Sequence, residues 1–295
     1  MTQIAVLTPD PADKTYVGRW PEVLDRLKAT LESTGATVTA TPWSDHVEDA
    51  SSLKAYDLIL PVIAWGYHRD HERWLKACAT WREADLAVAN PAEVLRWNSN
   101  KAYLARLADK GVPIPPTRWT DRVTQDQVDA AFAETGAPVL IVKPTVSAGA
   151  FRTLRLTPGE VLSDAPEGAA MIQPYLKSIE TQGETSLLFF GGRFSHAVNK
   201  RPVAGDFRIQ VQFGGLYKAV TPEAAAMALA EQVLAAIEEP LLYARIDMAR
   251  DDAGQWVLME AELIEPDFYL DHDPANGAGF AEAVKARLET WAASC

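Results

Sequence analysis

The sequence contains few cysteines and no long apolar run, and these absences exclude several classes of protein. Cys78 and Cys295 are its two cysteines among 295 residues. Two cysteines are too few for a disulfide framework and are typical of a reducing compartment. No apolar run approaches the roughly 20 residues that a membrane-spanning helix needs. The N-terminal MTQIAVLTPD lacks a basic segment, so we expect no signal peptide, a cytoplasmic location and no membrane partner.

Positive charge is also scarce. The chain has 28 Lys and Arg against 40 Asp and Glu, which gives a net charge of −12 and a pI of about 4.9. Such a balance disfavours nucleic acid as a partner, because nucleic-acid binding relies on a positive field. Hydrophobic residues make up 48% of the chain, enough for a core, and the length suggests two or three structural units. A homo-oligomer is compatible with this composition.

Histidine is sparse and forms no recognisable catalytic set. We find no Ser-His-Asp or Cys-His arrangement that predicts a protein nucleophile. His68 and His71 are one turn apart and could pair on a helix, but no third zinc ligand is in view. A surface or substrate-facing role is therefore favoured. The five histidines are His46, His68, His71, His196 and His272.

Strand and helix patterns alternate over residues 1–97. Short β-rich runs are separated by segments with apolar residues at helical spacing, as in Pro21–Ser33, where Val23, Leu24, Leu27 and Leu31 share a face. The alternation predicts a doubly wound α/β domain. The expected strands are 3–9, 37–43, 56–66 and 86–90, and the expected helices are 21–33 and 71–84.

Beyond residue 98 the pattern changes to hairpins and isolated helices. Gly191-Gly192 and the stretch 251–254 mark hairpin turns, and GVPIPPT (111–117) is a stiff connector that we expect to act as the hinge of a mobile lid near 115–175. The expected helices are 99–110, 125–135, 222–237 and 279–293. The expected strands are 137–144, 154–158, 169–176, the hairpin 183–202, 206–220 and the hairpin 243–264.

Carboxylates line a strand that is otherwise apolar. In WVLMEAELIEPDFYL (256–270), Glu260 and Glu262 alternate onto one face, and Glu265 and Asp267 follow. The hairpin lets Asp247 of the preceding strand share that face. Unpaired carboxylates repel one another when buried, and magnesium would resolve the repulsion with hard oxygen ligands. A solvent-exposed acidic face remains the alternative.

Basic residues elsewhere could serve phosphates. Lys143 ends an apolar strand before the small-residue loop TVSAGAF (145–151), and Lys101 opens a helix. A lysine beside such a turn can offer phosphate both a charge and backbone N–H groups, although the stretch is not a Walker motif. Lys200, Arg201 and Arg208 cluster in NKRPVAGDFR. Solvated surface cations are the alternative for each of these residues.

The order of these motifs resembles the ATP-grasp superfamily, in the branch with glutathione synthetase-like ATP-binding domains. NSNKAYL, VKP, IQPYL with GETSLLFF, NKRPVAGDFR and RIDMARDD…WVLMEAELIEP follow one another in the family's order. The resemblance covers almost the whole chain. It implies a combined α/β and α+β fold. The implied domains are a pre-ATP-grasp domain at 1–97, the small lid subdomain with its leading helix at 98–177, and the catalytic subdomain at 178–295.

The resemblance also implies roles for individual residues. Lys101 and Lys143 match the lysines on the nucleotide phosphates, and Glu184 matches the ribose-binding acid, with Glu180 as a fallback. Glu262 departs from the asparagine usual at the third metal position. The other implied contacts are Gln173, Tyr175 and Leu176 with adenine, Arg201 and Arg208 with the transferred phosphate, and Asp247, Glu260 and Glu262 with Mg²⁺, for which Mn²⁺ could substitute.

The implied activity is ATP-dependent ligation of a carboxylate to an amine through an acyl-phosphate on a small amino-acid-like substrate. PVIAWGY and ELIEP resemble a branch of ligases that includes D-cycloserine ligase, so intramolecular ring closure in antibiotic biosynthesis is the leading hypothesis. Trp65, Tyr67, His68 and Arg69 are the candidate acceptor residues because ligands gather at strand ends, and Arg208 could hold the substrate carboxylate. Packing of Trp65 and Tyr67 in the core, a peptide-modifying ligase and a catalytically inactive nucleotide-binding module remain alternatives.

Overall fold

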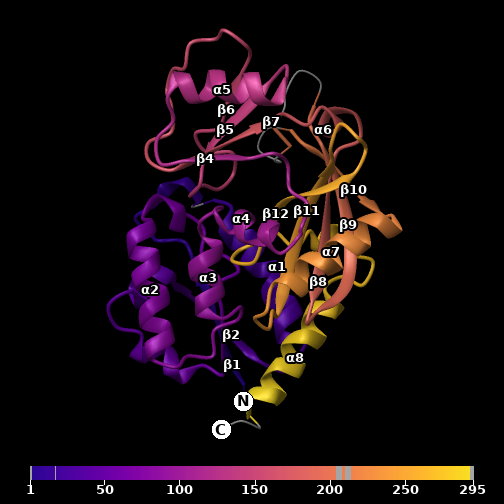
Figure 1. The fold of residues 1–295 in the computed structure, drawn as a ribbon. Coiled ribbons are helices and arrows are strands. Elements are labelled where there is room, and N and C mark those ends of the chain that lie inside the picture. The colour runs from indigo at the N-terminus through magenta and orange to yellow at the C-terminus, as the bar shows by residue number, and fades with distance from the viewer. Residues whose placement is uncertain (1, 17, 204–207, 210–213, 293–295) are drawn as a thin grey trace.

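Three sheets organise the computed structural model, which describes residues 2–16, 18–203, 208–209 and 214–292. The first sheet has three parallel strands in the order β2-β1-β3, and the other two are antiparallel, with the orders β4-β7-β5-β6 and β10-β9-β8-β11-β12. In Figure 1 the four-stranded sheet and α5 lie above the other two units. The predicted combination of an α/β unit with α+β units is confirmed.

The N-terminal unit is doubly wound because its central strand has two apolar faces. Ile4 and Val6 of β1 pack with α1, whereas Ala5 and Leu7 pack with the side of α2 and α3. All four side chains are completely buried, as expected for a parallel strand covered on both faces. The elements are β1 (Gln3–Thr8), α1 (Trp20–Glu32), β2 (Thr37–Pro42), β3 (Leu58–Leu60), α2 (His71–Glu83) and α3 (Ala92–Asn98).

Two predicted strands of this unit are shorter than expected. The stretch 56–66 forms a strand only at Leu58–Leu60, because Pro61 has no N–H to continue the ladder. A turn at Gly66, where φ is +88°, then leads into a single 3-10 turn at Tyr67–Arg69. The stretch 86–90 is reduced to one bridge between Ile59 and Val88.

Tertiary hydrogen bonds explain why the chain leaves the predicted pattern around residues 90–103. The Asn90 amide donates to the carbonyls of Tyr243 and Leu263. Asn98 ends a helix instead of starting one, and its amide donates to Ala261. The predicted helix 99–110 is therefore shortened to α4 (Tyr103–Asp109), and α3 was missed.

The lid segment carries the four-stranded sheet. Thr124 and Gln127 form a capping box that starts α5 (Gln125–Thr135), and Gly136 ends it in the left-handed conformation. Val128 and Ala131 of this helix pack on Leu140, Val142 and Ile172 of the sheet. The strands are β4 (Arg118–Thr120), β5 (Leu140–Pro144), β6 (Leu154–Leu156) and β7 (Ala170–Pro174).

The C-terminal unit contains both predicted hairpins. Gly191 and Gly192, with positive φ, turn β8 into β9, and β11 turns into β12 through Asp251–Gly254. The predicted strand 206–220 lies partly outside the described ranges, and within them it forms a strand only over β10. The elements are α6 (Ser178–Thr181), β8 (Glu184–Phe190), β9 (Arg193–Arg201), β10 (Leu216–Val220), α7 (Ala224–Ala236), β11 (Tyr243–Arg250), β12 (Trp256–Glu262) and α8 (Ala278–Ala292).

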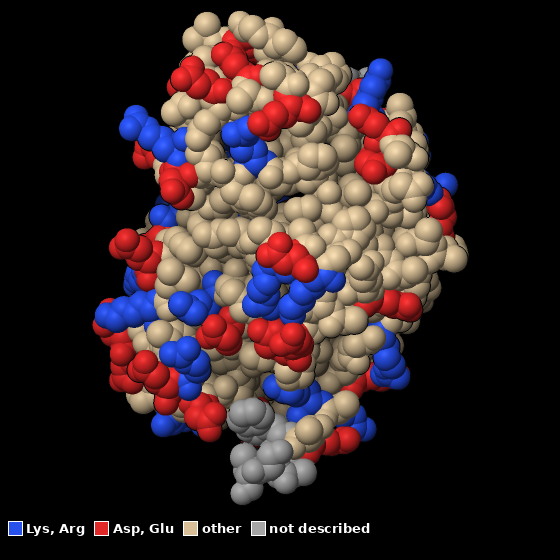
Figure 2. Space-filling view, in the orientation of Figure 1, with Lys and Arg blue, Asp and Glu red and all other residues tan. Residues whose placement is uncertain are grey.

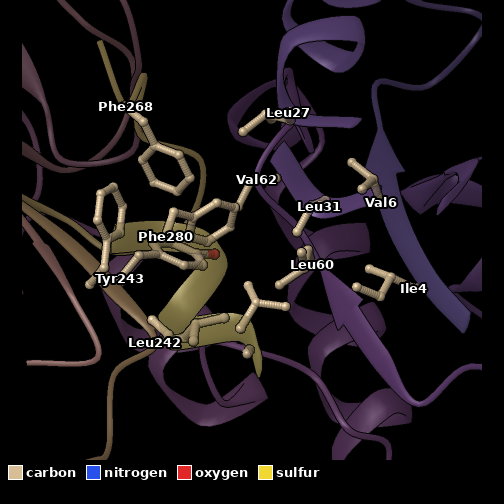
Figure 3. Close-up of a cluster of buried hydrophobic side chains, with 14 of the residues drawn as sticks. Ile4, Val6, Leu27, Leu31, Leu60, Val62, Leu242, Tyr243, Phe268 and Phe280 are labelled. Atoms are coloured by element: carbon tan, nitrogen blue, oxygen red, sulfur yellow. The ribbon is translucent and has the colours of Figure 1, made fainter. Parts of the chain in front are cut away.

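The N-terminal and C-terminal units share one hydrophobic core. Figure 3 shows Phe280 of α8 between Phe268 and Tyr243 on one side and the N-terminal side chains on the other. Leu27 and Val62 belong to the same buried cluster. We propose that the chain is divided into domains at 1–97, 98–177 and 178–295. The first and last of these domains pack against each other as one body.

The surface offers no broad field of one sign on the visible face. Acidic and basic side chains are interspersed in Figure 2, most densely over its lower half. Exposed ion pairs of the chain include Lys76 with Glu48. Among the described residues, no helix is long and apolar enough to cross a membrane.

Candidate active site

A cavity of about 610 Å³ is lined by residues from all three units. The N-terminal unit supplies Trp65, the lid supplies Lys143, and the C-terminal sheet supplies Asp247. We call the part around Lys101, Lys200, Arg245, Asp247 and Glu260 the ion-paired end. We call the part around Tyr16, Trp65, His68, Phe151 and Glu265 the aromatic end.

The ion-paired end is a product of strand register. Asp247 of β11 lies opposite Glu260 of β12, and Arg245 lies opposite Glu262. Directly opposed residues of an antiparallel pair share a face, so the predicted common face of the three carboxylates is confirmed. The sheet also places Arg245 among them, two residues before Asp247. The alternation that located Asp247 could have identified Arg245 in the sequence.

Asp247 is the most enclosed of the three carboxylates, with 2% of its surface exposed. Arg245 Nη2 donates to Oδ2 at 2.9 Å, Lys200 Nζ donates to the same oxygen at 3.1 Å, and Ser186 Oγ donates to Oδ1 at 2.6 Å. Burial opposes the charge of Asp247, but Arg245 and Lys200 outweigh it and lower the pKa of this carboxyl. Asp247 is therefore held as a carboxylate.

Glu260 is tied to the lid through Lys101. Lys101 Nζ donates to Glu260 Oε1 at 2.5 Å and to the carbonyl of Ser147 at 2.9 Å. Burial would raise the pKa of Glu260, yet Lys101 and Lys143 lower it. One lysine thus connects a candidate metal ligand to the loop between β5 and β6.

Glu262 is less strongly ionised than its two neighbours. Its carboxylate accepts from Arg245, but burial, with Glu260 and Asp247 adding repulsion, raises the pKa of Glu262 to about 8. Glu262 and Asp247 therefore share the single guanidinium group of Arg245. Glu262 is also the position at which the resemblance described above implies asparagine. A protonated Glu262 would resemble asparagine in charge.

The donor set is compatible with a divalent cation. Asp247 and Glu260 present hard carboxylate oxygens on opposed strands, which is the ligand chemistry that Mg²⁺ prefers. In this structure these oxygens contact lysine and arginine. Within the described ranges, no group of three or more His, Cys, Asp and Glu side chains is arranged to hold a metal ion. Metal binding would require Lys101 or Arg245 to move.

Lys200 occupies the place predicted for Arg201. Lys200 Nζ contacts Asp247 and lies 2.7 Å from Glu184 Oε1. Burial disfavours its charge, but Asp247 and Glu184 raise the pKa of Lys200 well above its usual value. Burial also raises the pKa of Glu184, despite Lys200.

Arg201 and Glu180 lie outside the cavity. Because strand side chains alternate, Arg201 points to the other face of β9, is exposed, and lines a separate hollow. Its Nε donates to Asn199 Oδ1 at 3.1 Å. Glu180 is exposed on α6. Of the predicted cluster, Lys200 and Arg208 line the cavity, whereas Arg201, to which the phosphate role was assigned, does not.

The residues predicted to contact adenine line the cavity beside the lid sheet. Gln173 donates to Thr117 Oγ1 at 2.9 Å, and the Tyr175 N–H donates to the carbonyl of Val139. Leu176 is buried next to these residues. Lys143 lies on the neighbouring strand β5, and burial lowers its pKa against the opposing effect of Glu260. Apolar lining comes from Ile141, Ile179, Ile209 and Met259.

The aromatic end contains the four predicted acceptor residues of the segment after β3. Trp65, Tyr67, His68 and Arg69 all line the cavity. The Trp65 ring lies 5.6 Å from that of Tyr16, and Arg69 lies 5.9 Å from the ring centroids of both Tyr16 and Phe151. Tyr67 also packs on Trp74 of the core, so this residue both lines the cavity and belongs to the core.

His68 and Glu265 have few partners at this end. His68 is 9% exposed, and its Nδ1 has no hydrogen-bond partner among the described residues. Burial, with Arg69 and Lys101, lowers the pKa of His68 to about 4. Burial and the charge of Glu262 raise the pKa of Glu265 well above its usual value.

Sequence reasoning missed the contribution of Tyr16, Arg19 and Phe151. Tyr16 and Arg19 come from the segment between β1 and α1, where no periodic pattern marks a contact. Phe151 stands in the small-residue loop after β5, and 43% of its surface is exposed. A large apolar residue within an otherwise small-residue loop was the available signal.

Comparison with known sequences finds a family model and a similar protein, both of which concern D-cycloserine synthetase. Residues 4–90 match the family model of the N-terminal domain of D-cycloserine synthetase DcsG. The chain is 27% identical over 275 residues to the cycloserine biosynthesis protein DcsG of Streptomyces lavendulae, covering 86% of this chain and 90% of that protein.

Comparison with solved structures extends the similarity over the whole chain. The crystal structure of DcsG matches with a TM-score of 0.78 and 25% identity over 97% of this chain and 99% of the other. The D-alanine–D-alanine ligase of Bacillus anthracis matches with a TM-score of 0.73 and 15% identity, covering 100% and 98%. The ATP-grasp ligase PsnB, in complex with a precursor variant, Mg and ADP, matches with 0.68 and 16%, covering 97% and 99%. The last two similarities concern the fold alone.

Proposed function

We propose that the chain is an ATP-grasp ligase similar to D-cycloserine synthetase, which joins a carboxylate to an amine on a small amino-acid-like substrate through an acyl-phosphate. The observation that carries this proposal is a single cavity in which lysines and carboxylates at one end meet aromatic rings at the other. The first set suits a nucleotide triphosphate and the second suits a compact acceptor.

The nucleotide would lie between the lid sheet and the C-terminal sheet. Gln173, Tyr175 and Leu176 would contact adenine, and Glu184 would accept hydrogen bonds from the ribose. Lys101 and Lys143 would neutralise phosphate charge. This arrangement is supported by the way these six side chains line one continuous cavity.

Asp247 and Glu260 would hold Mg²⁺, or Mn²⁺, with Glu262 as the third candidate ligand. A bound divalent cation draws charge from the oxygens of a transferring phosphoryl group. The role of the chain is to keep Asp247 ionised through Arg245 and Lys200 and to release Glu260 from Lys101. The released Lys101 would then be available to phosphate.

The chemistry would require no protein nucleophile. The substrate carboxylate attacks the terminal phosphoryl group of ATP, the bond to ADP breaks, and an acyl-phosphate forms. The amine then attacks the acyl carbon and phosphate leaves. Lys143, Lys200 and Arg208 would offset the charge on the transferred oxygens.

A compact acceptor is favoured by the enclosure of the aromatic end. Phe151 of the lid lies 5.9 Å from the ring of His68, so the lid approaches the segment that carries the acceptor residues. Such closure suits a free amino acid better than a long peptide. By analogy with DcsG, we propose intramolecular closure of an aminooxy acid, in the setting of antibiotic biosynthesis.

ADP release in the presence of ATP and magnesium tests the proposal. The panel comprises O-amino-D-serine, small D- and L-amino acids and dipeptide precursors. Turnover with a small amino acid supports the proposal and identifies the acceptor. Turnover with peptides alone would replace it with a peptide-modifying ligase. ATP binding without any turnover would indicate an inactive nucleotide-binding module.

Glu260→Gln is the matching variant. We expect a loss of turnover on the order of 100-fold, because the amide is a poorer ligand for magnesium, with a change of only about 1 kcal/mol in the free energy of unfolding. Steady-state kinetics at saturating magnesium and urea denaturation measure the two effects. An unchanged rate would remove Glu260 from the proposed metal site.

A further inference from the structure

Glu265 differs from every other acidic side chain that lines the cavity. Asp247, Glu184, Glu260 and Glu262 each contact a lysine or arginine, and Asp267 accepts from the N–H of Tyr269. Within the ranges that the structure describes, the Glu265 carboxylate makes neither a hydrogen bond nor an ion pair. A partly buried carboxylate without a partner is costly, so a cation from solution would stabilise this side chain.

The surroundings of Glu265 specify the kind of cation. The charged groups that act on it are Glu262 and Glu260, which repel a second negative charge, and the cations Arg245 and Lys101, which are hydrogen-bonded to Asp247 and Glu260 instead. Its charge also acts on the hydroxyls of Tyr16 and Tyr67. A carboxylate beside aromatic rings suits an organic ammonium group, whereas a hard metal ion would need several further oxygen ligands.

His68 gives an independent sign of a polar ligand at the same end. Its side chain is more than nine-tenths buried and lines the cavity, and Nδ1 has no partner among the described residues. Buried polar atoms are normally hydrogen-bonded. A ligand that carries both donors and acceptors would therefore satisfy His68 as well as Glu265.

We propose that Glu265 binds the α-ammonium group of the substrate and selects α-amino acids over acids without that group. The inference rests on the proposed function and names the substrate class more closely. An ammonium group held at Glu265 directs the neighbouring carboxylate of the same molecule toward Arg245 and the ion-paired end, where the terminal phosphate of ATP would lie. His68 supplies a hydrogen bond to the same molecule. Glu265 is thus a specificity-determining residue.

A pair of probes isolates the ammonium group. O-Amino-D-serine carries it, and 3-(aminooxy)propanoic acid is the same molecule without it. We expect the unmodified enzyme to prefer O-amino-D-serine by about 10- to 100-fold in kcat/KM, the range of a hydrogen bond to a charged group. In Glu265→Gln the preference should fall to less than about threefold, with the KM for ATP and the magnesium requirement unchanged.

Two further variants make the comparison specific. Glu282→Gln removes an exposed glutamate that pairs with Arg193 outside the cavity and should leave the preference intact. Glu265→Asp keeps the charge but retracts it by one methylene, so it should retain part of the preference. If Glu265→Gln does not fold, a rise in KM for O-amino-D-serine alone in Glu265→Asp tests the same contact.

The outcomes separate this inference from the proposed function. Equal preference in the unmodified enzyme and Glu265→Gln overturns the ammonium contact while the ligase activity stands. A changed magnesium requirement in Glu265→Gln also overturns it and identifies Glu265 as a metal ligand. No ADP release with any amino acid of the panel removes the proposed function and this inference with it.

Discussion

The two ends of the cavity solve the problem of buried charge in opposite ways. At the ion-paired end, Asp247 and Glu260 are neutralised by cations of the chain itself. At the aromatic end, Glu265 and His68 line the cavity beside aromatic residues, and neither makes a side-chain hydrogen bond or ion pair within the described part of the chain. The first end can exchange internal partners for a nucleotide and metal. The second end depends on the substrate to complete it.

The two ends of the cavity are also built from different kinds of segment. The ion-paired end is built mainly on β9, β11 and β12, whose register fixes opposed side chains. The aromatic end is assembled from segments between elements: Tyr16 precedes α1, Trp65 follows β3 and Phe151 follows β5. Sheet register determines the first arrangement, whereas packing among loops determines the second.

The largest effect is expected when one anion of the buried ion-pair network is removed. Asp247→Asn leaves Arg245 and Lys200 with one fewer anion in a buried site, so we expect the free energy of unfolding to fall by about 3 kcal/mol. Urea denaturation measures it. Asp271→Asn, which removes an exposed pair with Arg26, should cost less than about 0.5 kcal/mol. Equal effects of the two variants would refute the importance of the buried network.

A pH titration of stability sharpens the description of the aromatic end. Since burial lowers the pKa of His68 to about 4, the unfolded chain takes up a proton between pH 6.5 and 4 that the folded chain does not. This contribution to stability is complete above about pH 6.5 and is lost as the pH falls. Relative to His68→Gln, the native protein should lose about 2 kcal/mol between pH 7 and pH 5.

Denaturant midpoints of both proteins across that pH window provide the measurement. Parallel curves would mean that His68 titrates normally and is not enclosed as described. His272→Gln serves as the control, since His272 lies outside the cavity lining.

The smallest effect is expected for Arg201. Because it lies on the outer face of β9, Arg201→Ala should change kcat/KM for ATP by less than about twofold. Lys200→Met, one residue away on the inner face, should reduce it by at least tenfold, about 1.4 kcal/mol. A large effect of Arg201→Ala would restore the role that the sequence predicted for it.

Much of the fold was predictable because its signals are local. Alternating apolar residues and glycine turns identified both hairpins, and the alternation in β12 placed Glu260 and Glu262 on one face. The helix expected at 125–135 is α5, whose start is fixed locally by the capping box of Thr124 and Gln127. These features depend on backbone geometry over a few residues, which a single sequence contains.

The remaining features depend on contacts between distant segments. Asn90 and Asn98 redirect the chain through hydrogen bonds to residues more than 150 positions away, and no local pattern announces them. The inner position of Lys200, instead of Arg201, depends on the phase of β9 relative to its neighbours. The position of Tyr16 depends on how one irregular segment packs on another.

The shared core of Figure 3 limits how the enzyme can admit its substrates. Phe280 and Val62 belong to one cluster, so separating the N-terminal and C-terminal walls would expose that cluster to water. The lid packs its own, separate cluster around Val128 and Val142. The N-terminal and C-terminal walls therefore stay together, and an opening of the lid would have to disrupt the cluster that Met171 of β7 shares with Leu187 and Ile246 of the C-terminal sheet.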